Sequence, residues 1–278
     1  PISAIQMATI NTAEYFKIAN LGAIAPGYKA DMVVLPNLKD FKPSMVFKEG
    51  KLVAKDGKLI QNLDYVHIPS VRGSVNVNLD KNAFEIEAKS NSVKTINVLP
   101  HQLITKVSVE RIKIDDNNLA QSNIADDVLK IAVIERHRAS GNIGLGFVKG
   151  FGLQQGAIAS TVAHDSHNMI VIGTNDEDMY YAAKELVKSQ GGKIVVNNCK
   201  TLAHLPLPIA GLMSDKPLEE VIKKVNELNI AAKEIGCTIN DPFMSMAFLS
   251  LSVIPELKIT DKGLIDANKF EVTELFNV

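Results

Sequence analysis

Residues 169–198, MIVIGTNDEDMYYAAKELVKSQGGKIVVNN, place one amphipathic helix between two short apolar runs. The runs at the two ends are rich in Ile and Val, which predicts buried strands. The helix is predicted to start at Thr174, which is spaced with Glu177 as a capping box, and to stop at Gly191. Its apolar positions share one face: Met179, Ala182, Ala183, Leu186 and Val187. A helix between two buried strands predicts a layered domain of mixed α and β structure.

The neighbouring sequence extends this pattern on both sides. Three further apolar runs, 128–136, 144–152 and 156–163, are predicted strands. A second helix is predicted between Pro217 and Gly236, because Pro favours the first turn and Gly favours the end. Its apolar stripe consists of Leu218, Val221, Val225, Leu228, Ala232 and Ile235. The fold class is therefore predicted to be α+β.

The first seventy residues have a different character. Residues 1–22 carry apolar positions at helical spacing, with Ser3 and Gln6 as a capping box and Gly22 as a helix end. Pro1 leads directly into this helix, which we expect of a piece cut from a longer protein. The following residues contain Pro-Gly, Glu-Gly and Asp-Gly dipeptides between short apolar runs. These dipeptides predict tight turns and compact antiparallel β structure.

Alternating patterns predict more strands in two other parts of the chain. The β character continues from Val71 to Ile114, where residues 73–79, 83–88 and 105–114 alternate apolar and polar side chains with a period of two. The segment 246–260 near the C-terminus also reads as β structure.

Composition excludes several classes of function. The chain has 278 residues, 46% of them hydrophobic and 22% charged, which is a normal balance for globular domains. Its net charge of −1 provides no overall field for nucleic acid or an anionic membrane. Aromatic residues make up 5% and Trp is absent, which argues against stacking surfaces for single strands. The two cysteines, Cys199 and Cys237, are expected to be reduced core thiols of a cytosolic protein.

The segment 160–174, STVAHDSHNMIVIGT, concentrates polar groups between two predicted strands. Its cluster contains His164, Asp165, His167 and Asn168. Histidine can transfer protons near neutral pH, and a carboxylate can orient it or accept a proton. A metal site is a weaker interpretation, because the His-x-x-His pair lacks a third and fourth ligand nearby. A purely structural, hydrogen-bonded turn is the other alternative.

Other motifs carry less information. The glycine-rich segment 141–152 lacks the spacing of a phosphate-binding loop, so its glycines are expected to permit a bulge or the close approach of another backbone. The group Glu135, Arg136, His137 and Arg138 is interpreted as a solvated strand end in preference to an anion or partner contact. Three isolated histidines are assigned no chemistry: His67, His101 and His204. The H-x-E and P-C-x-x-C motifs of zinc-dependent base deaminases are absent, as is the H-x-H pair of barrel metal hydrolases.

Three stretches resemble a known family. Residues 7–35 contain GAIAPGYKAD and resemble the end of the barrel in the amidohydrolase superfamily. Residues 135–179 and 197–215 resemble the C-terminal domain of bacterial adenine deaminases, which belong to that superfamily. The resemblance covers essentially the whole chain.

The resemblance implies a division of the chain into three parts. Residues 1–20 would be the last helix of a TIM-type barrel, residues 21–70 part of a β-sandwich, and residues 71–278 a C-terminal mixed α/β domain. Most of the catalytic barrel would then lie outside this chain.

The resemblance also implies an activity. Family enzymes hydrolyse adenine to hypoxanthine and ammonia, a step of purine salvage and adenine catabolism, with manganese or iron held by the barrel. No position here matches a metal ligand, so we expect this portion to bind no metal and to be inactive alone. We expect His164, Asp165 and His167 to lie on a loop over the active site, with Ser166 and Asn168 contacting substrate. The alternative is a non-catalytic scaffold that supports the barrel and forms an oligomer interface.

The remaining expectations concern surroundings and partners. Adenine is the expected small-molecule substrate of the complete enzyme. We expect a cytoplasmic homo-oligomer that binds neither nucleic acid nor membrane.

Overall fold

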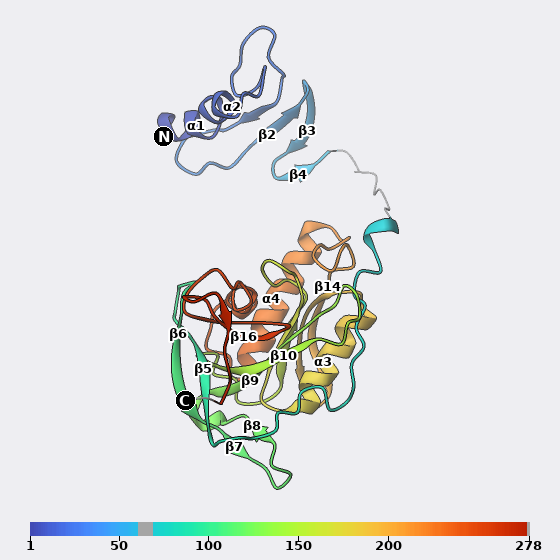
Figure 1. Cartoon of the computed structure of the whole chain (residues 1–278). Coiled ribbons are helices and arrows are strands. Elements are labelled where there is room, and N and C mark those ends of the chain that lie inside the picture. Colours follow the sequence, from blue (N-terminus) through green and yellow to red (C-terminus); the bar gives the residue numbers. More distant parts are fainter. Residues whose placement is uncertain (61–68, 277–278) are drawn as a thin grey trace. The chain divides into compact units, whose positions relative to one another are not determined.

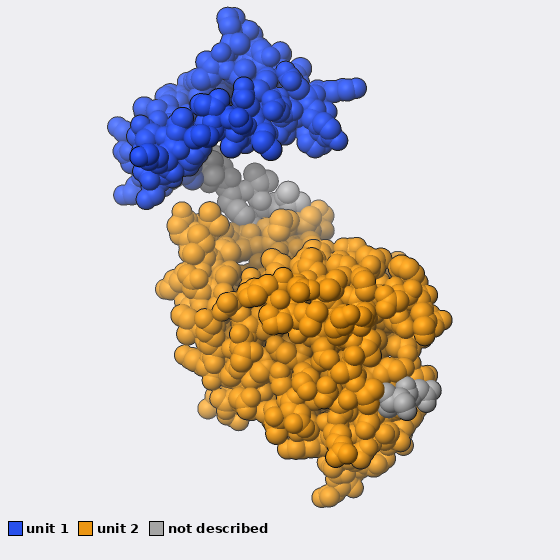
Figure 2. Space-filling model, turned by 90° about the vertical axis from the view of Figure 1, so that its left-hand side faces the viewer, with its two compact units in different colours: residues 1–67 blue, residues 68–278 orange. Residues whose placement is uncertain are grey.

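The computed structural model describes residues 1–60 and 69–276 and separates the chain into two compact units. They comprise residues 1–67 and residues 68–278 (Figure 2). His67 lies outside the described residues. Each unit is built on its own sheet, and the larger one carries the α+β fold that the sequence predicts.

The first unit is a small antiparallel sheet with two short helices. Its elements are α1 (Ile2–Met7), α2 (Ile10–Tyr15), β1 (Met32–Val34), β2 (Met45–Lys48), β3 (Lys51–Lys55) and β4 (Lys58–Leu59). The strands follow chain order in the sheet. Both predicted hairpin turns are confirmed: φ is 50° and 78° at Glu49 and Gly50, and 49° and 76° at Asp56 and Gly57. Positive φ at both central residues is the geometry that matches strand twist in a two-residue turn.

The prediction of one helix over residues 1–22 is wrong. The helix breaks at Thr9, whose φ of −130° and ψ of −100° are not helical, and α2 ends at Tyr15. The Thr9 hydroxyl donates to the Ile5 carbonyl at 2.6 Å, a local bond that competes with helix continuation. The Ser3–Gln6 capping box is also wrong, because α1 begins after Pro1 without a side-chain cap.

The second unit is centred on an eight-stranded mixed sheet in the order β14-β13-β11-β12-β9-β10-β5-β6. Among the described strands, β10 and β5 pair in parallel and the other pairs are antiparallel. The strands are β5 (Ser92–Val98), β6 (Thr105–Arg111), β9 (Val128–Ile134), β10 (Ile143–Lys149), β11 (Ala157–Ser160), β12 (Met169–Gly173), β13 (Gly192–Asn197) and β14 (Lys200–Pro206). The remaining elements are 3-10 helices η1 (Pro69–Val71) and η2 (Ile124–Asp126), strands β7 (Lys113–Ile114), β8 (Ala120–Gln121), β15 (Leu257–Thr260), β16 (Gly263–Asp266) and β17 (Glu271–Val272), and helices α3 (Asp176–Lys188), α4 (Leu218–Glu234) and α5 (Pro242–Ala247).

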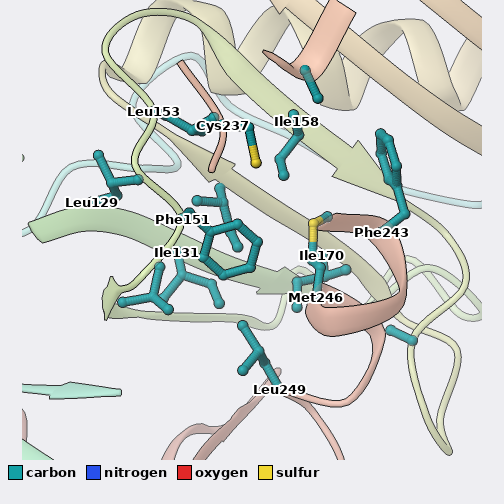
Figure 3. Packing of buried hydrophobic residues seen from close by; sticks show 14 of the residues in the cluster. Leu129, Ile131, Phe151, Leu153, Ile158, Ile170, Cys237, Phe243, Met246 and Leu249 are labelled. Carbon is teal, nitrogen blue, oxygen red and sulfur yellow. The ribbon is translucent and has the colours of Figure 1, made fainter. Parts of the chain in front are cut away.

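Both faces of this sheet are covered, and β9 is therefore buried along its whole length. On one face, α3 and the segment around Val75 and Phe84 pack on Ala132 and Ile134 of β9. On the other face, α4, α5 and the hairpin β15–β16 pack on Leu129, Ile131 and their neighbours (Figures 1 and 3). The predicted strands 128–136, 144–152 and 156–163 form the centre of this arrangement.

The glycine-rich segment brings backbones close together, as its interpretation predicted. Gly144 and Gly146 lie in β10 under the hairpin β15–β16. A Cβ atom on Gly144 would lie 1.8 Å from the carbonyl oxygen of Thr260. Glycine is therefore required at this position by the neighbouring backbone.

Several predicted elements differ from the structure. Residues 73–79 are not a strand, because their backbone N–H groups form hydrogen bonds outside any sheet. The Val75 N–H donates to Gln190 Oε1, and the Asn76 N–H donates to the Arg136 carbonyl. Residues 83–88 contribute only an isolated bridge between Glu87 and Leu119. In the segment 246–260, only Leu257–Thr260 is a strand, and α5 and turns precede it.

The structure also corrects the predicted cap of α3, the predicted apolar stripe of α4 and the predicted burial of one cysteine. Asn175, not Thr174, caps α3, since its side chain accepts from the Asp178 N–H. Leu218 begins α4 as predicted but is 68% exposed, so it lies outside the buried stripe. Cys237 is buried, whereas Cys199 is exposed and is not a core thiol.

Candidate functional site

Two polar turns meet at one end of the central sheet. Residues 135–142 follow β9, residues 161–168 precede β12, and Met169 pairs with Ile134 where these strands meet. The pairing brings His137 Nε2 to 2.7 Å from the Ser166 carbonyl oxygen. The two motifs that stand apart in the sequence are therefore one cluster in the fold.

Arg136 is the buried centre of this cluster. Its side chain is 1% exposed, and Nε donates to the His167 carbonyl at 2.5 Å. The other guanidinium nitrogens donate to the carbonyls of Ser74 at 3.0 Å and Ala210 at 3.1 Å. The interpretation of this strand end as solvated is therefore wrong for Arg136, although His137 and Arg138 are exposed.

Residues 161–168 form a turn that is held at several points. The His164 N–H donates to the Ala247 carbonyl at 2.8 Å, and the His167 N–H donates to the Ala163 carbonyl at 2.6 Å. Asn168 is buried and donates from Nδ2 to Asp261 Oδ1 at 3.1 Å. The turn is thus fixed by α5, by its own backbone and by the β15–β16 connection.

The two histidines of the turn lie close together, while the carboxylate points outward. The rings of His164 and His167 are 5.7 Å apart, and the His164 ring lies 4.6 Å from the ring of Phe248. Asp165 is 84% exposed on its side chain, and its Oδ1 is 3.8 Å from His164 Nδ1. The carboxylate is therefore accessible to a group that approaches from outside.

Two buried polar atoms of the turn have no hydrogen-bond partner among residues 1–60 and 69–276. They are His167 Nδ1 and Asn168 Oδ1. Burial lowers the pKa of His167, and the nearby His164 and Arg136 lower it further, which favours the neutral imidazole. Unpaired buried polar atoms are costly, so these two atoms mark a local deficit of hydrogen bonds in the turn.

The neighbouring turn is organised by Glu135. Its carboxylate accepts from the backbone N–H groups of His137, Arg138 and Ser140, at 2.5, 3.0 and 3.0 Å. Burial raises the pKa of Glu135, but the three backbone hydrogen bonds outweigh it and lower the pKa to about 2. Burial also lowers the pKa of Arg136 to about 10, so the guanidinium stays charged at neutral pH.

Sequence reasoning missed two residues of this site. Arg136 is a charged residue two positions after the mostly apolar strand 128–134, but its burial depends on segments far along the chain. Asp261 contacts both Asn168 and Asn142, and only the fold brings it near them. The isolated histidines remain separate: His101 is exposed, and His204 lies on β14, where burial lowers its pKa.

Comparisons with known proteins identify the family. The model of the adenine deaminase C-terminal domain matches residues 102–271, and that of the amidohydrolase family matches residues 1–53. The chain belongs to the adenine deaminase C-terminal domain family. The match to this family includes Arg136, the whole turn 161–168 and Asp261.

Curated relatives agree with this membership. The chain is 48% identical over 277 residues to an adenine deaminase of Desulfatibacillum aliphaticivorans, covering 99% of this chain and 48% of the relative. It is 47% identical over 272 residues to adenine deaminase 2 of Carboxydothermus hydrogenoformans, covering 97% of this chain and 48% of the relative. The chain therefore spans about half the length of the curated adenine deaminases that it matches.

Two further observations bear on this member of the family. Within the residues that the structure describes, no group of three His, Cys, Asp or Glu side chains is arranged to hold a metal ion. None of the described helices is long and apolar enough to cross a membrane.

Proposed function

We propose that this chain is the C-terminal portion of an adenine deaminase, which hydrolyses adenine to hypoxanthine and ammonia as a complete enzyme. The observation that carries the proposal is its identity of 48% to a curated adenine deaminase over only 48% of that protein's length. The amidohydrolase family model matches residues 1–53, which supports the proposal that these residues belong to the barrel-containing part of such an enzyme. We propose the domain boundaries accordingly: a last barrel helix in 1–20, a sandwich segment in 21–70 and a C-terminal domain in 71–278.

The surface of the first unit supports this proposal. Among residues 1–60, Ala13 is the one buried hydrophobic residue. Large apolar side chains are instead exposed, among them Tyr15 at 80% and Ile24 at 87%. A cavity of about 470 Å³ in this unit is lined by apolar groups that include Ile5, Ile24 and Phe41. Exposed apolar surface of this extent is typical of an interface, and the proposed occupant is the remainder of the enzyme.

The polar turn 161–168 is the proposed contribution of this chain to the site. Hydrolysis joins water to the ring carbon that bears the amino group, and protons must reach the departing amine as ammonia leaves. We propose that His164, Asp165 and His167 lie on a loop that closes over the purine and assists these proton transfers. Ser166 and Asn168 hold the purine edge, and the unpaired Asn168 Oδ1 is the acceptor available for it.

The metal of this proposed enzyme belongs to the part outside this chain. Manganese or iron would activate water there. The described residues do not fit such a centre, because no three potential ligands come together among them. The role of this chain is therefore derived without any step through the metal. A cytoplasmic location and a homo-oligomeric state are parts of the same proposal.

The experiment changes His164→Ala, Asp165→Ala and His167→Ala singly in the full-length protein and measures ammonia release from adenine. If the turn assists proton transfer, at least one change lowers kcat by about a hundredfold or more. If the turn only holds substrate, KM rises instead. His101→Ala is the matched control, because His101 is an exposed histidine outside the cluster.

The second candidate function is a scaffold that supports the barrel and forms an oligomer interface. The observation that favours it is that backbone atoms of the turn are bonded on several sides by Arg136, His137 and Ala247. Unchanged kcat and KM in all three variants would establish this alternative. For the 278-residue chain alone, supplied with manganese or iron, we expect no turnover of adenine.

A further inference from the structure

Arg136 occupies a position that packing alone does not explain. A guanidinium that is 1% exposed carries a desolvation cost, and among the described residues it makes no salt bridge with a carboxylate. All its strong hydrogen bonds go to main-chain carbonyls, on the segments of Ser74, His167 and Ala210. These three segments are connected to one another through a single side chain.

The surrounding residues are shaped to admit this guanidinium. Gly211 has φ of +70°, and a Cβ atom there would lie 2.7 Å from Arg136 Nη1. The Gly211 carbonyl accepts from the Thr161 hydroxyl at 2.6 Å, and that hydroxyl accepts from the Gly192 N–H at 2.9 Å. Arg136 and Thr161 therefore attach the two ends of the turn 161–168 to the same loop, residues 207–213.

We infer that Arg136 is a positioning residue for the proposed deamination: by holding the His167 carbonyl, it fixes the turn 161–168 in its working geometry. The atoms that the turn leaves without partners, His167 Nδ1 and Asn168 Oδ1, directly flank that carbonyl in the chain. Movement of this carbonyl displaces both atoms. Misplacement of reacting or positioning groups by about 1 Å can cost about a hundredfold in rate. This inference rests on the proposed function.

The charge of Arg136 also affects the pKa of His167, which gives the proposed role a second measurable effect. The groups that face His167 are His164 and Asp165 on its own turn, Arg136 and His137 on the adjacent turn, and Asp261 through Asn168. Removal of the guanidinium charge raises the pKa of His167, because a nearby cation disfavours the imidazolium. Lysine at this position retains the charge but cannot reach three carbonyls in different directions.

The test compares Arg136→Met, Arg136→Lys and the control Arg138→Ala in the full-length enzyme. Arg138 lies in the same turn and is exposed, and its side chain makes no hydrogen bond or ion pair with the described residues. We expect kcat to fall about a hundredfold in Arg136→Met with KM changed only a few-fold, and to recover partly in Arg136→Lys. The limb of the pH profile of kcat that reports His167 moves to higher pH in Arg136→Met only. Unchanged kcat, or a lowered kcat with no shift of either limb, overturns the inference.

Hydrogen exchange followed by mass spectrometry keeps the test decisive if a variant is poorly folded. Deuterium uptake should rise in peptides covering 161–168 and stay unchanged in α4. Gly211→Ala provides a second route, because it displaces the guanidinium while the charge remains. Unchanged uptake over 161–168 in both Arg136→Met and Gly211→Ala overturns the inference. A wild-type enzyme without activity on adenine refutes the proposed function, whereas the exchange result still decides whether Arg136 holds the turn.

Discussion

His137 Nε2 lies 2.7 Å from the carbonyl oxygen of Ser166, and this contact joins two polar turns that are 29 residues apart in the chain. The ring of His137 can reach that carbonyl because its own turn is fixed by Glu135. The Glu135 carboxylate accepts three backbone N–H bonds and thereby determines the course of residues 135–140. The stability of the candidate site therefore depends in part on the ionised form of one carboxylate.

The first prediction concerns the pH dependence of that carboxylate. The pKa of Glu135 is about 2 in the folded protein, below its ordinary value of 4.5. Its contribution to stability is thus present above pH 4.5 and is lost as the pH falls toward 2. At pH 7 we expect Glu135→Gln to lower the free energy of unfolding by about 1 kcal/mol, allowing for solvent screening of a partly exposed group. Melting temperatures of both proteins should converge near pH 2; a difference that is constant with pH would contradict this account.

The central strands could be predicted from the sequence, because the apolar runs that indicate a strand are also the residues that must be buried. Val128–Ile134 is apolar except for Lys130, and only a strand covered on both faces buries every residue of such a run. The strand β5 lies within the predicted β region 71–114 but was not singled out, because SVKTINV carries a polar residue, Thr95, at a buried position. Residues 73–79 alternate as a strand should, yet side chains and turns elsewhere satisfy their backbone.

The candidate site was predictable only in its local part. His164, Asp165, His167 and Asn168 are neighbours in the chain, so their clustering needed no knowledge of the fold. The burial of Arg136 depends on carbonyls contributed by residues 74, 167 and 210. No local pattern contains that information, because the pairing of β9 with β12 and the path of two distant loops create it.

The second prediction separates the observed cap of α3 from the predicted one. Asn175 Oδ1 accepts from the Asp178 N–H at 2.8 Å, while Asn175 Nδ2 donates to Asp178 Oδ2 at 3.0 Å. We expect Asn175→Ala to lower the free energy of unfolding by about 1 kcal/mol. Glu177→Ala removes the partner of the predicted capping box, and because Glu177 is exposed we expect a change within about 0.5 kcal/mol. Urea denaturation of the two variants measures both values, and a larger loss in Glu177→Ala would favour the original capping box.

The third prediction concerns the buried ion pair beneath α3. Lys130 is 1% exposed, and Nζ donates to both carboxylate oxygens of Asp176, at 2.7 and 2.8 Å, and to the Phe84 carbonyl at 3.2 Å. Lys130→Met leaves a half-buried carboxylate without its partner, which we expect to cost about 3–5 kcal/mol. The double variant Lys130→Met/Asp176→Asn removes the charge that was left and should recover part of this loss. A double-mutant cycle by urea denaturation measures the coupling, and additive losses would show that the two groups do not stabilise each other.

The last prediction uses two glycines of one strand as a matched pair. A Cβ atom on Gly146 would lie 3.1 Å from Leu264 Cδ2 and 3.3 Å from Ile259 Cδ1, both ends of side chains that can shift. On Gly144 it would lie 1.8 Å from the Thr260 carbonyl oxygen and 2.8 Å from the Gly263 nitrogen, which are backbone atoms of the β15–β16 hairpin. We expect Gly146→Ala to lower the free energy of unfolding by about 1–3 kcal/mol, the usual cost of overpacking. Gly144→Ala should cost more, because the hairpin must move away as a unit and expose the apolar side chains beneath it.

Hydrogen exchange over 257–266 should then increase in Gly144→Ala and change little in Gly146→Ala. Equal exchange and equal stability in the two variants would mean that the close approach of these backbones does not limit the packing of the hairpin.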